Sequence, residues 1–206
     1  MYLITVWVAS AIITLGSLWY CFLIWRRRVH PSLASFLIFS ISFPLGFWMY
    51  MQNPHWSWGG NIGVLNSIVS TWMISATLFI RLIKDGKLSV ELNKPQRRTI
   101  YASIVILIFW VITRDHLTAY ILLQASILIG YVAMVKKFWN WQGKNPDSIT
   151  FWLLNFLGTL VAVYAAIERN DLESWIYILR ALPCMLFLIF ILLRLEMRMK
   201  RQQVQG

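Results

Sequence analysis

Residues 25–36 read WRRRVHPSLASF, and residues 136–151 read KKFWNWQGKNPDSITF. Both stretches follow an apolar segment, carry basic residues, and open the next apolar segment with the pattern Pro-x-x-x-[Ser/Thr]-Phe. Pro31 and Pro146 are 115 positions apart, and so are Phe36 and Phe151. This spacing predicts two related halves, and the interface between such repeats is where membrane transporters place substrate sites.

The composition excludes an ordinary soluble domain. Of the 206 residues, 59% are hydrophobic and only 13% are charged, which is typical of a polytopic membrane protein. The net charge of +11 comes from short basic blocks that lie between apolar segments. That distribution follows the positive-inside rule, so we expect membrane lipid as a partner and no nucleic acid.

Seven apolar segments reach or approach the length of about 20 residues that a bilayer requires. They cover residues 3–25, 33–51, 62–83, 100–113, 117–135, 149–167 and 175–193, and the fourth is the shortest. Sixteen of the 19 Lys and Arg residues lie in or beside the segments that follow the first, third, fifth and seventh spans. We therefore predict an all-α membrane protein with seven transmembrane helices, its N-terminus outside and its C-terminus in the cytoplasm.

A polar connection after the third span divides the chain. We predict a first three-helix unit over residues 1–83 and a basic cytoplasmic linker with spacer helix four over residues 84–115. A second three-helix unit follows over residues 116–195, and a basic cytoplasmic tail over residues 196–206. Two units of the same orientation need an odd helix between them, so this 3+1+3 layout is a parallel repeat about the membrane normal.

The layout and the proline-opened second helix of each half resemble the SWEET/PQ-loop superfamily of MtN3-like transporters, and nicotinamide riboside-type transporters share the layout. The closest local match runs from Pro146 to Asp171. The Pro-Gln pair of that superfamily is absent, because Ser32 follows Pro31 and Asp147 follows Pro146. The resemblance implies a divergent bacterial-type member in the inner membrane, with Pro31 and Pro146 in structural or hinge roles.

Polar and aromatic side chains within the spans are candidates for a solute site, because polar groups in a bilayer cost free energy. Ser40 and Asn155 are 115 positions apart, so they occupy equivalent positions of the two halves. Asn66 and Arg180 are 114 apart, so their positions are near-equivalent. The resemblance implies polar pocket residues on helices three and seven and aromatic ones on helices two and six. The candidate substrate-binding residues are Ser40, Trp48, Asn66, Gln124, Trp152, Asn155 and Arg180.

Several candidates have an alternative role in packing. Intramembrane Asn and Ser side chains often join helices through hydrogen bonds, so Asn66 and Asn155 either line a pocket or hold helices together. Glu173 lies seven residues before Arg180, about two turns away on the same helix face. Arg180 therefore either forms an ion pair or outer gate with Glu173, or selects an anion in the pocket.

These patterns favour a facilitative transporter of a small polar solute, with a pocket between the two three-helix units. The three histidines are scattered, no Gly-rich phosphate loop occurs, and the seventh span has no lysine, so we expect no metal, no cofactor and no enzyme activity. The alternative is a non-transporting accessory, assembly or receptor protein on the same scaffold. Both interpretations allow the chain to form a homo-oligomer.

Overall fold

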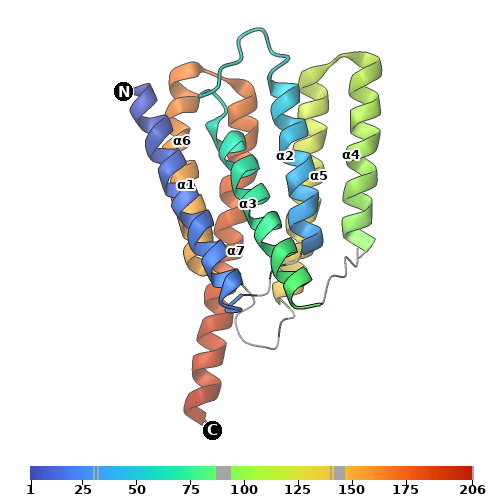
Figure 1. Cartoon of the computed structure of the whole chain (residues 1–206). Coiled ribbons are helices and arrows are strands. Elements are labelled where there is room, and N and C mark those ends of the chain that lie inside the picture. The colour runs from blue at the N-terminus through green and yellow to red at the C-terminus, as the bar shows by residue number, and fades with distance from the viewer. Residues whose placement is uncertain (30, 32, 87–93, 140, 142–146, 206) are drawn as a thin grey trace.

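Seven α-helices and no strand form the part of the chain that the computed structural model describes, which is residues 1–29, 31, 33–86, 94–139, 141 and 147–205. The helices are α1 (Tyr2–Trp25), α2 (Leu33–Tyr50), α3 (Ile62–Lys84), α4 (Lys94–Thr113), α5 (His116–Trp139), α6 (Ile149–Arg169) and α7 (Leu172–Gln205). Consecutive helices run in opposite directions, and the two chain ends lie at opposite ends of the bundle (Figure 1). The predicted all-helical class is confirmed.

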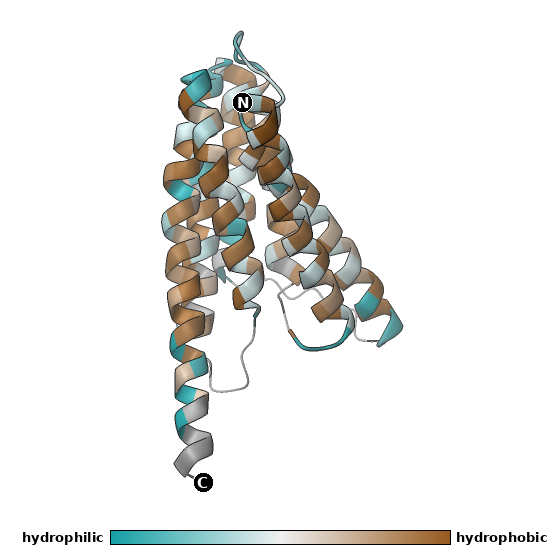
Figure 2. Ribbon diagram, turned by 90° about the vertical axis from the view of Figure 1, so that its left-hand side faces the viewer, coloured by the Kyte–Doolittle hydropathy of each residue, from teal (hydrophilic) through white to brown (hydrophobic). Residues whose placement is uncertain are grey.

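The helices have the length and apolar surface of membrane spans. By length and composition α1, α3, α6 and α7 could each cross a membrane, and shorter apolar stretches lie in α2, α4 and α5. Hydrophobic residues dominate the helices, while hydrophilic ones gather towards their ends and connections (Figure 2). Large apolar side chains such as Ile112 and Leu179 are largely exposed, which water would penalise. These features indicate an integral membrane protein.

Helix α7 is longer than its apolar pattern predicts. Its 34 residues correspond to about 51 Å at 1.5 Å per residue, against a hydrocarbon core of about 30 Å. The helix continues through most of residues 196–206, which the sequence pattern indicated only as a basic tail, and it projects beyond the rest of the bundle (Figure 1). The Arg194 guanidinium lies 3.8 Å from the ring centroid of Trp139 on α5, a cation–π contact that ties α7 to α5.

The helices pack in the same order within each half of the chain. Helix α3 contacts both α1 and α2, and α7 contacts both α5 and α6. The halves meet mainly along two contacts, which we call the α1/α6 seam and the α2/α5 seam, and α3 makes smaller contacts with α6 and α7. Helix α4 packs mainly on α5 and makes a smaller contact with α2. Figure 1 shows α1 and α6 at one side of the bundle and α4 and α5 at the other.

Backbones approach closely in the α1/α6 seam. A Cβ atom on Gly16 would lie 3.0 Å from the Cβ of Leu154. A Cβ atom on Gly158 would clash with Ile13 and would lie 3.2 Å from the carbonyl oxygen of Ala9. Small residues that admit a neighbouring backbone are the usual means of tight helix packing in membranes.

The α2/α5 seam is looser. A Cβ atom on Gly130 would have its nearest neighbour, the Phe39 ring, at 3.4 Å. A Cβ atom on Gly46 would meet Leu123 at the same distance, which is ordinary van der Waals contact. Side chains, rather than backbones, therefore fill this seam.

A proline within α2 connects that helix to α3. Pro44 has no N–H for the carbonyl of Ser40 one turn earlier. That carbonyl instead accepts a hydrogen bond from Trp72 Nε1 on α3, at 2.9 Å. The Ser40 hydroxyl lies 2.9 Å from the Ser75 hydroxyl and donates to the Thr71 carbonyl at 3.3 Å. Both polar groups of Ser40 are thus used in packing α2 against α3.

Candidate functional site

A small cavity with aromatic and polar walls lies where the two halves of the bundle meet. Its lining comes from α2, α3, α5, α6 and α7 and consists of Phe36, Phe39, Phe43, Ser67, Ser70, Thr71, Tyr131, Phe151, Trp152, Asn155 and Met185. Its volume of about 30 Å³ suits a water-sized occupant and is well below the roughly 300 to 1,000 Å³ of ligand pockets. Two predicted site residues, Trp152 and Asn155, belong to this lining.

Asn155 lies where α6 faces both the cavity and α1. Its amide nitrogen donates to the carbonyl of Phe151, one turn earlier, at 2.9 Å. The same nitrogen would lie 3.6 Å from a Cβ atom on Gly16 of α1. Asn155 therefore lines the cavity and also lies in the α1/α6 seam, and the hydrogen bond of its amide nitrogen stays within α6.

Hydroxyl groups of α3 form another wall. Ser17 of α1 donates to the Ser70 hydroxyl at 2.7 Å, and the Ser67 hydroxyl lies 2.9 Å from the Tyr177 hydroxyl of α7. Thr71 Oγ1 donates to the Ser67 carbonyl at 2.8 Å. Hydroxyls both donate and accept hydrogen bonds, so this wall can serve a polar occupant without a fixed charge.

Aromatic rings close the cavity on its other sides. Tyr131 stacks on Phe39 with ring centroids 5.3 Å apart, and it meets Trp152 edge-on at 6.2 Å. Phe151 meets Trp152 edge-on at 5.0 Å and stacks on Tyr20 of α1 at 4.2 Å. The Trp152 indole N–H is buried and has no hydrogen-bond partner in the part of the chain that the structure describes. It is therefore a donor that a cavity occupant could use.

Arg180 lies in a cage of three aromatic rings next to the cavity. Its Cζ is 5.1 Å from the centroid of Tyr177 and 5.6 Å from those of Phe43 and Tyr131, and the last two rings also line the cavity. The side chain is only 9% exposed. None of its three nitrogens has a hydrogen-bond partner among the described residues. Ring faces attract the charge but leave the N–H donors unused.

The ion pair between Arg180 and Glu173 does not form. The Glu173 carboxylate, buried in the first turn of α7, accepts hydrogen bonds from Asn53 at 3.0 and 3.1 Å. His116 Nε2 lies 3.8 Å from the same carboxylate. The adjacent Ser174 donates to the carbonyl of Gly60 at 2.7 Å. These contacts attach the connection between α2 and α3 to the start of α7, and Asn53 offered no sequence signal for this role.

Gln124 and Asn66 do not line the cavity. Gln124 of α5 is 3% exposed, and neither of its amide atoms has a partner within the described residues. Its Nε2 would lie 3.6 Å from a Cβ atom on Gly46, so it occupies the α2/α5 seam. One turn earlier, the Tyr120 hydroxyl accepts a hydrogen bond from Asn61 at 3.0 Å. Asn66 is also buried, and its amide nitrogen has no partner in the described part of the chain.

The other predicted residues lie away from the cavity. Trp48 is 47% exposed and contacts Trp110 of α4 edge-on at 5.3 Å, so it faces the outside of the bundle. Ser40 bonds to α3, as described above. Pro31 lies in the connection before α2, and Pro146 lies outside the described residues.

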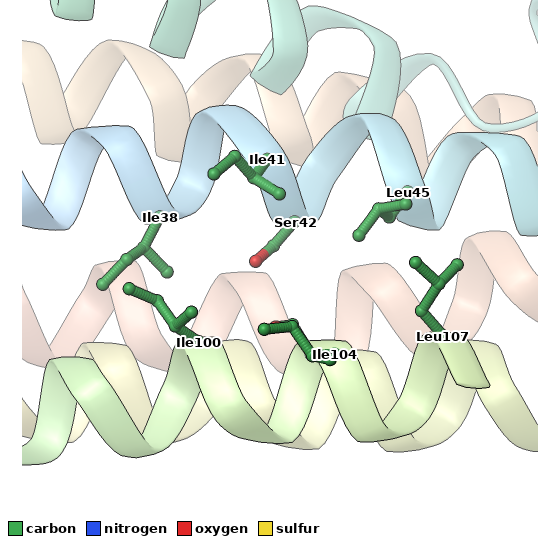
Figure 3. A pocket seen from close by; sticks show the side chains of 8 residues that line it. Ile38, Ile41, Ser42, Leu45, Ile100, Ile104 and Leu107 are labelled. Carbon is green, nitrogen blue, oxygen red and sulfur yellow. The ribbon is translucent and has the colours of Figure 1, made fainter. Parts of the chain in front are cut away.

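A larger space between α2 and α4 is apolar (Figure 3). Its volume is about 200 Å³, and its lining is Ile38, Ile41, Ser42, Leu45, Ile100, Ser103, Ile104 and Leu107. Figure 3 shows the Ser42 hydroxyl directed into it among isoleucine and leucine side chains. Ile41 and Ile104 are exposed at its edge. This crevice suits hydrocarbon, and it offers a polar solute too few hydrogen bonds.

No protein-family model, no curated protein and no solved structure matches this chain. The resemblance to the SWEET/PQ-loop superfamily therefore stays a prediction from the sequence.

Proposed function

We propose that this chain is a facilitative membrane transporter of a small polar solute that passes between two three-helix units, α1–α3 and α5–α7. The cavity at the junction of the units carries this proposal. It combines aromatic walls with the hydroxyls of α3 and the amide of Asn155. Polar side chains around an internal space of a membrane protein are costly and commonly mark a solute path.

Matching contacts in the two seams support a parallel repeat. Gly16 lies against Leu154 in the α1/α6 seam, and Gly130 lies against Phe39 in the α2/α5 seam. Gly130 follows Gly16 by 114 positions, and Leu154 follows Phe39 by 115. An axis along the membrane normal that exchanges α1 with α5 and α2 with α6 would superpose one contact on the other. Helix α4 would then be the spacer of a 3+1+3 arrangement.

The charge distribution supports the proposed orientation. Sixteen of the 19 Lys and Arg residues belong to the bundle end at which α1, α3, α5 and α7 finish, or to the segments that follow those helices. Cytoplasmic segments carry such an excess. We therefore propose seven spans with the N-terminus outside and the C-terminus in the cytoplasm, in the bacterial inner membrane that the resemblance implies.

A non-transporting accessory, assembly or receptor protein is the second candidate. The small volume of the cavity, about 30 Å³, favours it, because transport requires the two units to separate far enough to admit a solute. The looser α2/α5 seam is the contact that could separate with the smaller loss of packing.

A swelling assay on proteoliposomes distinguishes the two candidates. Liposomes with the purified chain receive an osmotic shock with ribose, glycine, nicotinamide, potassium nicotinate or potassium lactate, and light scattering follows their re-swelling. Valinomycin is present throughout, so that K⁺ can accompany a transported anion. A transporter accelerates re-swelling above that of empty liposomes for at least one solute. Asn155→Leu should lower the rate of re-swelling with that solute by about tenfold, the equivalent of about 1.4 kcal/mol.

Ser40→Ala is the matched control, because Ser40 occupies the repeat position of Asn155 but bonds to α3. Its re-swelling rate should stay near that of the unaltered protein. Rates equal to those of empty liposomes for every solute would reject transport and favour the accessory protein.

A further inference from the structure

A buried cation without a counter-ion lies inside the bundle. Arg180 is nine-tenths buried, and no carboxylate in the described part of the chain forms an ion pair with it. The candidate partner Glu173 is bonded to Asn53 instead. Removing a charge from water costs several kcal/mol unless a partner compensates. Three ring faces offset part of that cost through cation–π attraction.

The cage that holds Arg180 is fixed in place. The Tyr177 hydroxyl bonds to Ser67, a residue that lines the cavity. The Tyr177 ring lies so close to Gly63 of α3 that any Cβ atom there would clash with it. Tyr131, the second ring, is held by its stack on Phe39. A preorganised cage of this kind holds the guanidinium in one position. Arg180 does not itself line the cavity, but it lies against Phe43 and Tyr131, two rings that do.

Further unsatisfied polar atoms occur on the same side of the bundle. Tyr120, Gln124 and Tyr131 are spaced by four and seven residues, which places them on one face of α5. Both amide atoms of Gln124, and the oxygen of Asn61 beside Tyr120, are buried without a partner among the described residues. Nearly all buried polar groups in proteins are satisfied, so these atoms are further donors and acceptors that a bound solute could use.

From this geometry we infer that the solute is an organic anion whose carboxylate pairs with Arg180, and whose apolar body contacts Phe43 and Tyr131, once the two units have separated far enough to admit it. This inference rests on the proposed transport function. A guanidinium matches the two oxygens of a carboxylate with parallel hydrogen bonds. The aromatic walls favour an organic body over inorganic phosphate, and a neutral polar solute would leave the charge of Arg180 uncompensated.

Matched acids and amides test the inference. The purified full chain in detergent is melted with nicotinate or nicotinamide, with lactate or lactamide, and with inorganic phosphate, all at one ionic strength. Each pair differs in charge and little in size. The acids should raise the apparent melting temperature by at least about 2 °C. The amides should leave the melting temperature unchanged, and phosphate should raise it less than nicotinate does.

Substitutions of Arg180 identify the group responsible. Arg180→Gln should abolish the acid-dependent shift, and Arg180→Lys should weaken acid binding about tenfold, because an ammonium lacks the planar fork. Arg169→Gln is the matched control, since Arg169 is exposed and its guanidinium also lies over a ring, that of Tyr2, at 4.6 Å. If Arg180→Gln does not fold, Arg180→Lys carries the test alone. Equal shifts for acids and amides, or unchanged acid binding in Arg180→Lys, would overturn the inference.

The swelling assay separates this inference from the proposed function. If neutral solutes cross the membrane, and acids neither cross it nor stabilise the protein, the result supports transport and rejects the anion site. If acids stabilise the protein through Arg180 but no solute crosses the membrane, the result supports the anion site and rejects transport.

Discussion

The α1/α6 seam and the α2/α5 seam join the same two halves of the bundle in different ways. In the first, Gly16 and Gly158 let two backbones meet closely. In the second, the rings of Phe39 and Tyr131 and the unsatisfied amide of Gln124 lie between the helices. A close backbone contact has one good geometry, whereas side chains can repack. We therefore expect the halves to pivot at α1/α6 and to separate at α2/α5.

Crosslinking each seam should have the largest effect. In a background with Cys21→Ser and Cys184→Ser, one variant carries Phe39→Cys with Gly130→Cys, and another carries Leu154→Cys with Gly16→Cys. A short bifunctional thiol reagent across α2/α5 should stop solute-dependent re-swelling, because the halves can no longer separate there. The same reagent across α1/α6 should leave most of the re-swelling, and the reverse result would contradict the pivot.

Single alanine substitutions compare the closeness of the seams directly. Gly158→Ala should lower the free energy of unfolding by about 1 to 3 kcal/mol, the usual cost of overpacking, because its methyl group meets Ile13 and the Ala9 backbone. Gly130→Ala should cost less than about 0.5 kcal/mol, as substitutions without a steric conflict do. Unfolding in mixed detergent micelles measures both, and equal costs would show that the seams are equally tight.

The hydrogen bond that compensates for Pro44 should contribute a smaller amount. Trp72→Phe removes the donor to the Ser40 carbonyl and should cost about 1 to 2 kcal/mol for an unsatisfied acceptor. In a Pro44→Ala background the helix supplies its own N–H, so the same change should cost less. A double-mutant cycle of unfolding free energies measures this coupling. Additive effects would mean that the indole is not the substitute donor.

The outward face of α2 should be the least sensitive. Trp48 contacts Trp110 of α4 and is half exposed, so Trp48→Phe should change stability by less than about 0.5 kcal/mol and leave re-swelling unchanged. The same substitution in the cavity, Trp152→Phe, should slow re-swelling, because the buried indole N–H is lost. If both substitutions slowed re-swelling equally, the cavity would not be the solute path.

Apolar runs predicted most of the fold. Five of the seven spans were predicted with bounds close to those of the helices, because long apolar segments bounded by charges leave a membrane chain few alternatives. The exceptions are α4, which begins at Lys94, and α7, which continues to Gln205. In both, a helix continues into polar sequence, and hydropathy reports the span rather than the length of the helix.

The repeat predicted the site only in part. Asn155 lines the cavity, but Ser40, at the matching position, bonds to α3. Pro44 lies one turn after Ser40, whereas Thr159 occupies the corresponding place after Asn155 and donates to its carbonyl. The two helices therefore use equivalent positions differently, and spacing alone could not distinguish them.

The sequence by itself determined that this is a helical membrane protein, where its helices lie, and which ends of them carry the positive charge. Those properties follow from local composition and length. Only the tertiary structure decided that Glu173 bonds to Asn53, that Arg180 lies among three rings with no counter-ion among the described residues, and that Asn155 lines the cavity. The physical reason is that helical periodicity determines which residues share a face, but packing determines which other helix that face meets.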